Sequence, residues 1–332
     1  MPGGFREERQ ATTVELATVR LGRLPTRLDR FLYAPAMCDW ILAAYFFTVI
    51  VGLTRGRPSP ARDTYLVLVS AVLILFMGAV YVFRLRFEPR RAGFGLQLAY
   101  HLLPLVAILT FYLNLRPILP IINGASYDDS LYQLDVRLLG FEPTLLVERW
   151  SSRNVVEWFS FFYYSYFFLI ASFVFVLILT CTDDERLSHF ATGIILIVAI
   201  GHFIYTLVPG LGPYMYLAHE YRAPLEGGTF YNLILEAVSG AGPLRDIFPS
   251  LHTALPTFCA LYAWRHYPRV APVASFFAAN IMVATIVLRW HYAADVAAGL
   301  LLAGFAFIVS PRLTEAYQAR RAEAGLAHLR RW

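Results

Sequence analysis

Residues 245–295 read RDIFPSLHTALPTFCALYAWRHYPRVAPVASFFAANIMVATIVLRWHYAAD and contain two apolar runs joined by a turn at Pro268 and Arg269. Each run, of about 17–20 residues, is about 30 Å long as a helix, enough to cross the hydrocarbon of a bilayer. A pair of helices that runs out and back returns to the face it left. His252, at the start of the first run, and His291, just after the second, are therefore predicted to share one membrane surface.

The composition predicts a membrane protein with several spans. Of the 332 residues, 58% are hydrophobic and 15% are charged, a balance that excludes a soluble domain with one apolar helix. We predict an all-α fold, a polytopic membrane helical bundle of about eight transmembrane helices. The expected spans are residues 36–54, 64–83, 94–115, 156–181, 190–208, 251–267, 270–288 and 291–310.

The polar segments set the expected topology. All 28 basic residues are arginine, and they lie in segments between and beside the spans, which fits the positive-inside rule better than nucleic-acid binding. Because the span number is even and the inner segments hold more arginine than the outer ones, both termini are expected in the cytoplasm and residues 211–248 outside. Arginine without lysine indicates a bacterium with a GC-rich genome, and hence its plasma membrane.

Three further features of the chain carry expectations. RLLGFEPTLLVERW (137–150) is expected to lie as a short helix along the membrane interface, and the aromatic block EWFSFFYYSYFF (157–168) favours the headgroup belt over stacking on a lipid or sugar. The long loop before residue 245 is expected to be functional. Packing roles without metal-ligand spacing are predicted for Cys38, Cys181 and Cys259.

The sequence PSLH marks the start of the first apolar run. Pro249 suits the first turn of a helix and the Ser250 hydroxyl can cap it, which places His252 within that turn. A helix start presents free N–H groups and the positive end of the dipole, so it favours an anion such as phosphate. Alone, this short pattern favours ordinary helix capping.

The sequence RWHYAAD follows the second run. If the last span begins here, His291 and Asp295 are four residues apart on one helix face. A carboxylate bonded to one imidazole nitrogen fixes the tautomer and makes the other nitrogen more basic, which suits a nucleophile. The alternative is an interfacial histidine beside a helix acid. Because both patterns fall at the outer ends of spans joined by one hairpin, we favour a joint functional site with His252.

PSLH followed about forty residues later by HYAAD resembles the type 2 phosphatidic acid phosphatase superfamily. Within it, the chain is most similar to the inositol phosphorylceramide synthase branch, with Pro-Ser-Leu-His and His-Tyr-x-x-Asp. The resemblance is strong over residues 245–300 and absent over the first two spans. It implies three regions: a basic segment and two extra transmembrane helices (1–93), a six-helix phosphatase-type catalytic core (94–310) and an arginine-rich cytoplasmic tail (311–332).

The resemblance also implies a mechanism. His291 would attack phosphorus and form a phosphohistidine, Asp295 would orient His291, and His252 would protonate the leaving oxygen. Water or an acceptor hydroxyl would then take the phosphoryl group, with His252 acting as base. No metal and no other cofactor is implied.

Two departures from the superfamily pattern concern the cations that would bind phosphate. The arginine expected six residues before the nucleophilic histidine is replaced by Thr285. The upstream Lys-x6-Arg-Pro motif is missing, since the chain has no lysine and Arg-Pro occurs only at Arg57 and Arg116, neither with the right partner. GLGPYMY (210–216) is the stretch expected in its place.

The phosphate still needs cationic donors. Arg245 ranks first among them, because it lies shortly before the helix start that carries PSLH. The expected phosphate-binding residues are Arg245, Ser250, Arg289 and Arg222, and the expected substrate-binding residues are Tyr214 and His219.

We therefore expect a lipid phosphotransferase at the outer membrane face. It would move an inositol phosphate or similar phospho-headgroup from a membrane phospholipid donor to a lipid or glycan acceptor. A lipid phosphate or polyprenyl diphosphate phosphatase, which uses water, is the alternative within the same chemistry. A non-catalytic lipid transporter or scramblase would not need His252, His291 and Asp295 together. No nucleic-acid partner is expected.

Overall fold

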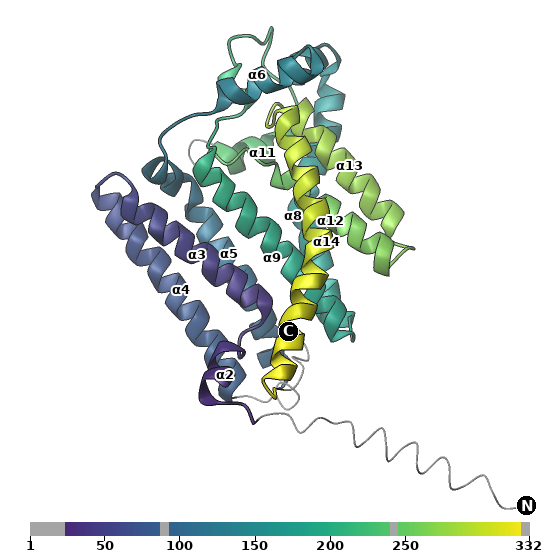
Figure 1. The fold of residues 1–332 in the computed structure, drawn as a ribbon. Helices are drawn as coiled ribbons and strands as arrows, with labels where there is room; N and C mark the ends of the chain where they lie inside the picture. Colours follow the sequence, from purple (N-terminus) through teal and green to yellow (C-terminus); the bar gives the residue numbers. More distant parts are fainter. Residues whose placement is uncertain (1–23, 87–92, 240–244, 327–332) are drawn as a thin grey trace, which may run out of the picture.

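The computed structural model describes residues 24–86, 93–239 and 245–326, and these ranges contain helices and loops without strands (Figure 1). Six helices are long and apolar enough to cross a membrane. They are α3 (Met37–Arg55), α4 (Pro60–Arg86), α5 (Phe94–Ile122), α8 (Arg153–Thr180), α9 (Asp184–Leu207) and α14 (Ala293–Glu323). The predicted all-α membrane bundle is confirmed.

The predicted hairpin consists of α12 (Leu251–His266) and α13 (Ala271–Val287), which are shorter than the other spans. With 16 and 17 residues, they are about 24–26 Å long, slightly less than the roughly 30 Å of a hydrocarbon core. Of the eight expected spans, six are therefore found as helices long and apolar enough to cross a membrane, and the two of the hairpin are shorter helices.

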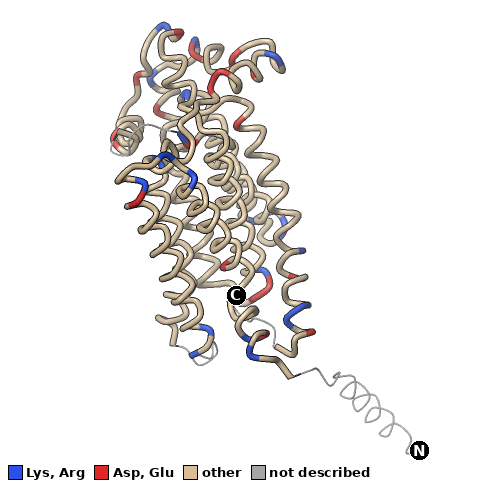
Figure 2. The backbone as a smooth tube through the Cα atoms, turned by 60° about the vertical axis from the view of Figure 1, so that its left-hand side comes forward, with Lys and Arg blue, Asp and Glu red and all other residues tan. Residues whose placement is uncertain are grey.

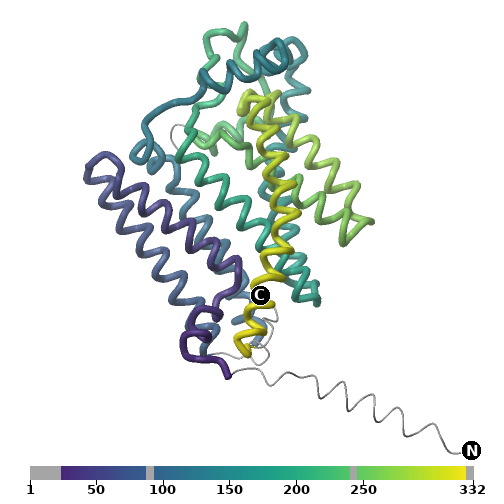
Figure 3. Tube along the Cα trace, in the orientation of Figure 1, coloured from purple at the N-terminus to yellow at the C-terminus, as the bar shows by residue number. Residues whose placement is uncertain are grey.

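Most charged residues lie toward the two ends of the bundle, and the length between them is largely free of charge (Figure 2). The end of α14 lies near α2 (Arg27–Leu32) at one end, and α6 (Asp128–Leu139) crosses the other end (Figures 1 and 3). The Tyr317 hydroxyl of α14 donates to the Pro35 carbonyl at 2.7 Å. The described N-terminal and C-terminal parts are therefore at the same end, here called the α2 end, opposite the α6 end.

The hairpin packs into the bundle through α12, while α13 lies at the outer edge (Figure 1). α12 contacts α13, α14 and α8, and α14 contacts α9. At Gly299 of α14, an added Cβ would lie 2.5 Å from the Ser250 carbonyl oxygen, so only glycine lets α14 come this close to the start of α12. Small residues likewise let α12 and α13 pack closely, and the buried ones are Ala260, Ala263, Ala271, Ala274 and Ala278.

Buried polar contacts attach the first two spans to the rest. On α3, the Tyr45 hydroxyl lies 3.0 Å from Nδ1 of His202 on α9. Also on α3, Asp39 accepts a hydrogen bond from the Tyr100 hydroxyl of α5 at 2.9 Å. Arg84 of α4 donates to the same hydroxyl at 3.0 Å. α3 and α4 are therefore part of one bundle with α5 and α9.

Short helices cover the α6 end. They are α6, α7 (Pro143–Val147), the 3-10 turn Glu148–Trp150, α10 (Pro213–Tyr216) and α11 (Thr229–Ser239). The short helix expected over residues 137–150 is divided, because α6 ends at Gly140, whose φ of 82° is left-handed, and α7 starts with Pro143. α11 lies against α8, where the Glu157 carboxylate accepts the N–H of Gly228 at 2.7 Å.

Candidate active site

The structure brings His252 and His291 together at the α6 end. His252 lies in the first turn of α12, and His291 lies between α13 and α14. Their ring centroids are 5.9 Å apart. The hairpin thus returns both histidines to one end of the bundle, as its out-and-back path predicts.

His291 is oriented by Asp295. Its Nδ1 lies 3.2 Å from Oδ2 of Asp295, and the two side chains are 5% and 0% exposed. The two side chains therefore pair, but His291 lies before the helix, because α14 begins at Ala293. The same Oδ2 also caps the helix by accepting the N–H of Tyr292 at 2.9 Å. With the Nδ1 proton donated to the carboxylate, Nε2 keeps its lone pair for attack on an electrophile.

Ser250 occupies the N-cap position of α12, but its hydroxyl makes no bond to the helix backbone, so the predicted side-chain cap is wrong. The hydroxyl instead accepts a hydrogen bond from the Thr253 hydroxyl at 3.2 Å. The Ser250 N–H donates to the Asp295 carbonyl at 3.0 Å, which the close approach at Gly299 permits. The two histidine-bearing turns are therefore joined directly.

Aromatic rings of α8 form one wall of the site. The His252 ring is stacked on Tyr163, with centroids 4.4 Å apart and planes at 16°, and the Tyr166 centroid is 4.3 Å from it. The centroid of the Trp290 ring lies 6.2 Å from that of Tyr163. Assigning the block 157–168 to the headgroup belt is therefore wrong for these two tyrosines, since both pack on His252.

α6 supports the start of α14. The two carboxylate oxygens of Asp135 accept hydrogen bonds from the Ala293 and Ala294 N–H groups at 2.6 and 2.8 Å. Burial raises the pKa of Asp135, and these two hydrogen bonds oppose the rise. Burial also raises the pKa of Glu142 to about 7, and the charges of Asp135 and Asp295 add to this rise. The start of α14 is thus held from behind by the buried Asp135 carboxylate.

Asp135→Ala is expected to lower stability and activity together. Losing a helix cap costs about 0.5–2 kcal/mol, and the exposed N–H groups would be those next to the His291–Asp295 pair. Thermal unfolding in detergent and turnover of the same preparation check this. Asp129→Ala, at an exposed position of the same helix, is the matched control. A melting temperature equal to that of the control would remove the capping role.

Two of the expected phosphate-binding arginines are engaged by protein groups. Arg245 donates from Nη1 to the Ala125 carbonyl at 2.9 Å. Arg289 has a left-handed φ of 65° and is 5% exposed. Its guanidinium lies 3.7 Å over the Tyr221 ring and 3.2 Å from the Glu148 carboxylate. Both guanidinium groups therefore already bond other parts of the protein.

Arg116 of α5 is a further cation at this site. Its Nε lies 3.6 Å from Asp246, just before PSLH, and its Nη1 donates to the Val238 carbonyl at 3.4 Å. The Arg116 and Asp246 side chains are 13% and 8% exposed, so their charges are only weakly screened. The sequence marks this arginine only by the Arg-Pro dipeptide at 116–117. Because the lysine of the Lys-x6-Arg-Pro motif is missing, that dipeptide alone does not predict a phosphate-binding role.

A hollow of about 570 Å³ reaches Arg289, two residues before His291, and its lining also includes Tyr214, Tyr221, Arg222 and Tyr231 but neither histidine. The Tyr214 ring stacks on Trp290 at a centroid distance of 4.7 Å. His219, by contrast, is directed to solvent, with 75% of its side chain exposed beside Glu220. Tyr214 and Arg222 therefore share the wall of this hollow with Arg289.

A model of the PAP2 superfamily matches residues 129–309. The matched region begins in α6, ends in α14 and contains His252, His291 and Asp295. No curated protein and no solved structure matches the chain.

Proposed function

The chain belongs to the PAP2 superfamily, the type 2 phosphatidic acid phosphatases and their relatives, and on that premise we propose that it is a lipid phosphotransferase. Membership makes it a membrane enzyme of the phosphatase or phosphotransferase type, with a membrane lipid phosphate as substrate and water or a lipid as acceptor. The proposal adds that the moved group is a phosphorylated polyol such as inositol phosphate, as in the inositol phosphorylceramide synthase branch that the motifs resemble. It also assigns catalysis to His291, His252 and Asp295.

In the first half-reaction, Nε2 of His291 attacks the phosphorus of the donor phosphodiester. A P–N bond forms, the P–O bond to diacylglycerol breaks, and protonated His252 gives its proton to the departing oxygen. The 5.9 Å between the ring centroids is on the scale of one phosphoryl group held between nucleophile and acid. Asp295 stabilises the positive charge that develops on His291.

In the second half-reaction, an acceptor hydroxyl attacks the same phosphorus. His252, now neutral, takes the hydroxyl proton as the new P–O bond forms. The P–N bond breaks and leaves His291 neutral, bonded through Nδ1 to Asp295, so both histidines end in their starting states. Water in place of the alcohol gives hydrolysis through the same steps.

The hollow of about 570 Å³ is the observation that favours transfer of a polyol phosphate over simple hydrolysis. Water needs no such space, whereas a polyol needs hydrogen-bonding groups and flat apolar faces. Tyr214 offers both, next to Trp290. Arg222 adds positive charge in the same lining, where Arg289 is paired with Glu148. We propose that His219 contacts the headgroup from the exposed rim.

Product analysis with purified protein tests the proposal. Phosphatidylinositol labelled in its phosphate is supplied with and without a lipid or glycan alcohol. We expect labelled inositol phosphate on the acceptor, with a yield that rises with acceptor concentration. Release of inorganic phosphate from a lipid phosphate monoester, with no labelled acceptor from the diester, would identify a phosphatase instead.

Arginine-to-lysine variants identify the phosphate-binding cation. We expect Arg116→Lys to lower kcat by about 10²–10³, because an ammonium cannot make the bidentate contact of a guanidinium. Arg245→Lys is expected to have a small effect, since its present contact is one hydrogen bond to a carbonyl. Steady-state kinetics of both variants measures the two losses in kcat. A larger loss in Arg245→Lys than in Arg116→Lys would give the phosphate-binding role to Arg245, as its position before PSLH suggests.

We propose that the α6 end faces outside and the termini the cytoplasm, because arginine is enriched in the segments at the α2 end. In a background lacking the three native cysteines, an impermeant thiol reagent should label Glu226→Cys in intact cells. Glu323→Cys, at the α2 end, should react only after lysis. Both positions are exposed. Labelling in the opposite pattern would invert the orientation.

A further inference from the structure

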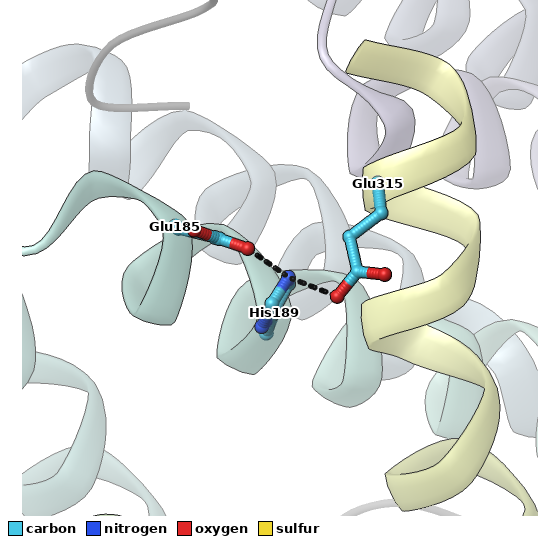
Figure 4. A group of neighbouring side chains, drawn as sticks. All are labelled: Glu185, His189 and Glu315. Atoms are coloured by element: carbon cyan, nitrogen blue, oxygen red, sulfur yellow. Dashed lines mark ion pairs between the residues drawn. The ribbon is translucent and has the colours of Figure 1, made fainter. Parts of the chain in front are cut away.

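Three side chains at the α2 end form a cluster away from the catalytic site (Figure 4). Glu185 and His189 share one face of the first turns of α9, and Glu315 faces them from α14. Nε2 of His189 lies 3.8 Å from a carboxylate oxygen of Glu185 and 3.9 Å from one of Glu315. Glu315 lies about 33 Å along α14 from the helix start, so the cluster takes no direct part in phosphoryl transfer.

His189 distinguishes this cluster from an ordinary group of exposed acids. The residue is 9% exposed, and its Nε2 is buried without a hydrogen-bond partner. Figure 4 shows this nitrogen directed toward both carboxylates. Both carboxylates lie within ion-pair distance of the nitrogen but beyond hydrogen-bond distance. A cation between the three side chains would bond the nitrogen and both carboxylates.

We propose that Glu185, His189 and Glu315 bind a divalent transition-metal cation, with Zn²⁺ as the expected ion. Zn²⁺ accepts imidazole nitrogen together with carboxylate oxygen, whereas Ca²⁺ and Mg²⁺ prefer oxygen donors. One nitrogen and two oxygens supply three ligands and leave a position for water. The cation offsets the charges of both carboxylates and bonds the unpartnered nitrogen.

The spacing of the donors suits such an ion after a small contraction. With metal–ligand bonds of about 2.0–2.1 Å, neighbouring donors of a tetrahedral site are about 3.4 Å apart, and the three donor atoms here lie within 4.8 Å of one another. The Glu185 and Glu315 side chains are 60% and 58% exposed, so they can turn inward without disturbing the packed helices. The hollow that they help to line, of about 250 Å³, gives an ion access.

A cation at this position would link α9 to α14. The same two helices are joined nearby, where the Thr314 hydroxyl donates to the Thr192 hydroxyl at 3.2 Å. α14 starts two residues after His291, so the link would hold the far end of the helix that follows the catalytic turn. Because the ion binds only the folded arrangement, it stabilises the enzyme increasingly as its free concentration rises.

Zinc titration of the purified, tag-free enzyme tests the proposal. Calorimetry should give one saturable site per chain, and the melting temperature should rise with free Zn²⁺. Loss of an outer-shell partner already weakens metal binding about 10–100-fold, so His189→Ala and Glu315→Gln should each cost at least tenfold in affinity. His219→Ala removes an exposed histidine at the other end and should leave the zinc affinity unchanged.

Glu315→Gln keeps the size of an exposed side chain, so its result stands even if His189→Ala fails to fold. Equal zinc affinity in wild type, Glu315→Gln and folded His189→Ala would show adventitious binding elsewhere and contradict the proposal. Absence of saturable zinc binding by the wild type would also contradict it, and would identify the cluster as a histidine paired with two carboxylates.

Discussion

His291→Ala is expected to abolish turnover in a protein that remains folded. Where catalytic residues act as a unit, removing the nucleophile costs about 10⁶ in kcat, and we propose that His291 forms the P–N bond. The helix start behind it is still capped by Asp295 and Asp135. Turnover of the lipid donor, measured with the melting temperature on the same preparation, checks both halves of the expectation.

A second substitution separates the loss of the nucleophile from damage to the site. His291→Gln keeps a side-chain donor for the buried Asp295 carboxylate and should be as inactive as His291→Ala. His266→Ala, which changes a histidine at the opposite end of α12, should retain activity. Substantial turnover by either His291 variant would remove the nucleophile assignment.

His252→Ala is expected to lower kcat by about 10²–10⁴, the usual contribution of a general acid or base. His252 is placed for both roles, because its ring is fixed against Tyr163 and Tyr166 and faces His291 at 5.9 Å. The protein retains the nucleophile, so turnover should be slow rather than absent. Steady-state kinetics with the lipid donor measures this loss.

The leaving group provides the control for the acid role. An aryl phosphate ester departs without protonation, so the formation of the phosphoenzyme from it should be much less impaired in His252→Ala. His291→Ala should be inactive toward both substrates. An equal loss for lipid and aryl leaving groups in His252→Ala would contradict proton donation by His252 and leave it a positioning role only.

The meeting of His252 and His291 at one end of the bundle is predictable from the sequence for a simple physical reason. Two apolar runs of membrane-spanning length, with a turn at Pro268 and Arg269, fix which end of the bundle each run begins and ends on. His252 and His291 therefore reach the same end without any knowledge of how the other helices pack. The all-α class follows likewise from the hydrophobic composition.

The rest of the site depends on helix packing, which spacing along one chain does not determine. Tyr163 and Tyr166 contact His252 because α8 packs on α12, and an aromatic block at a span end fits the headgroup belt equally well. Asp135 supports the site only because α6 lies across the start of α14. Arg116 is missed because the superfamily motif also demands a lysine, which the chain lacks. The structure places Arg116 beside Asp246, just before PSLH.

The phosphorylated enzyme is the most direct test of the account. Purified protein is mixed with a donor lipid labelled in its phosphate, quenched in alkali, which preserves a P–N bond, and digested for mass spectrometry. We predict an acid-labile adduct on His291 that forms before product, disappears when acceptor is added, and is absent from His291→Ala. Product formation at the full rate with no adduct on His291 during a single turnover would contradict the account.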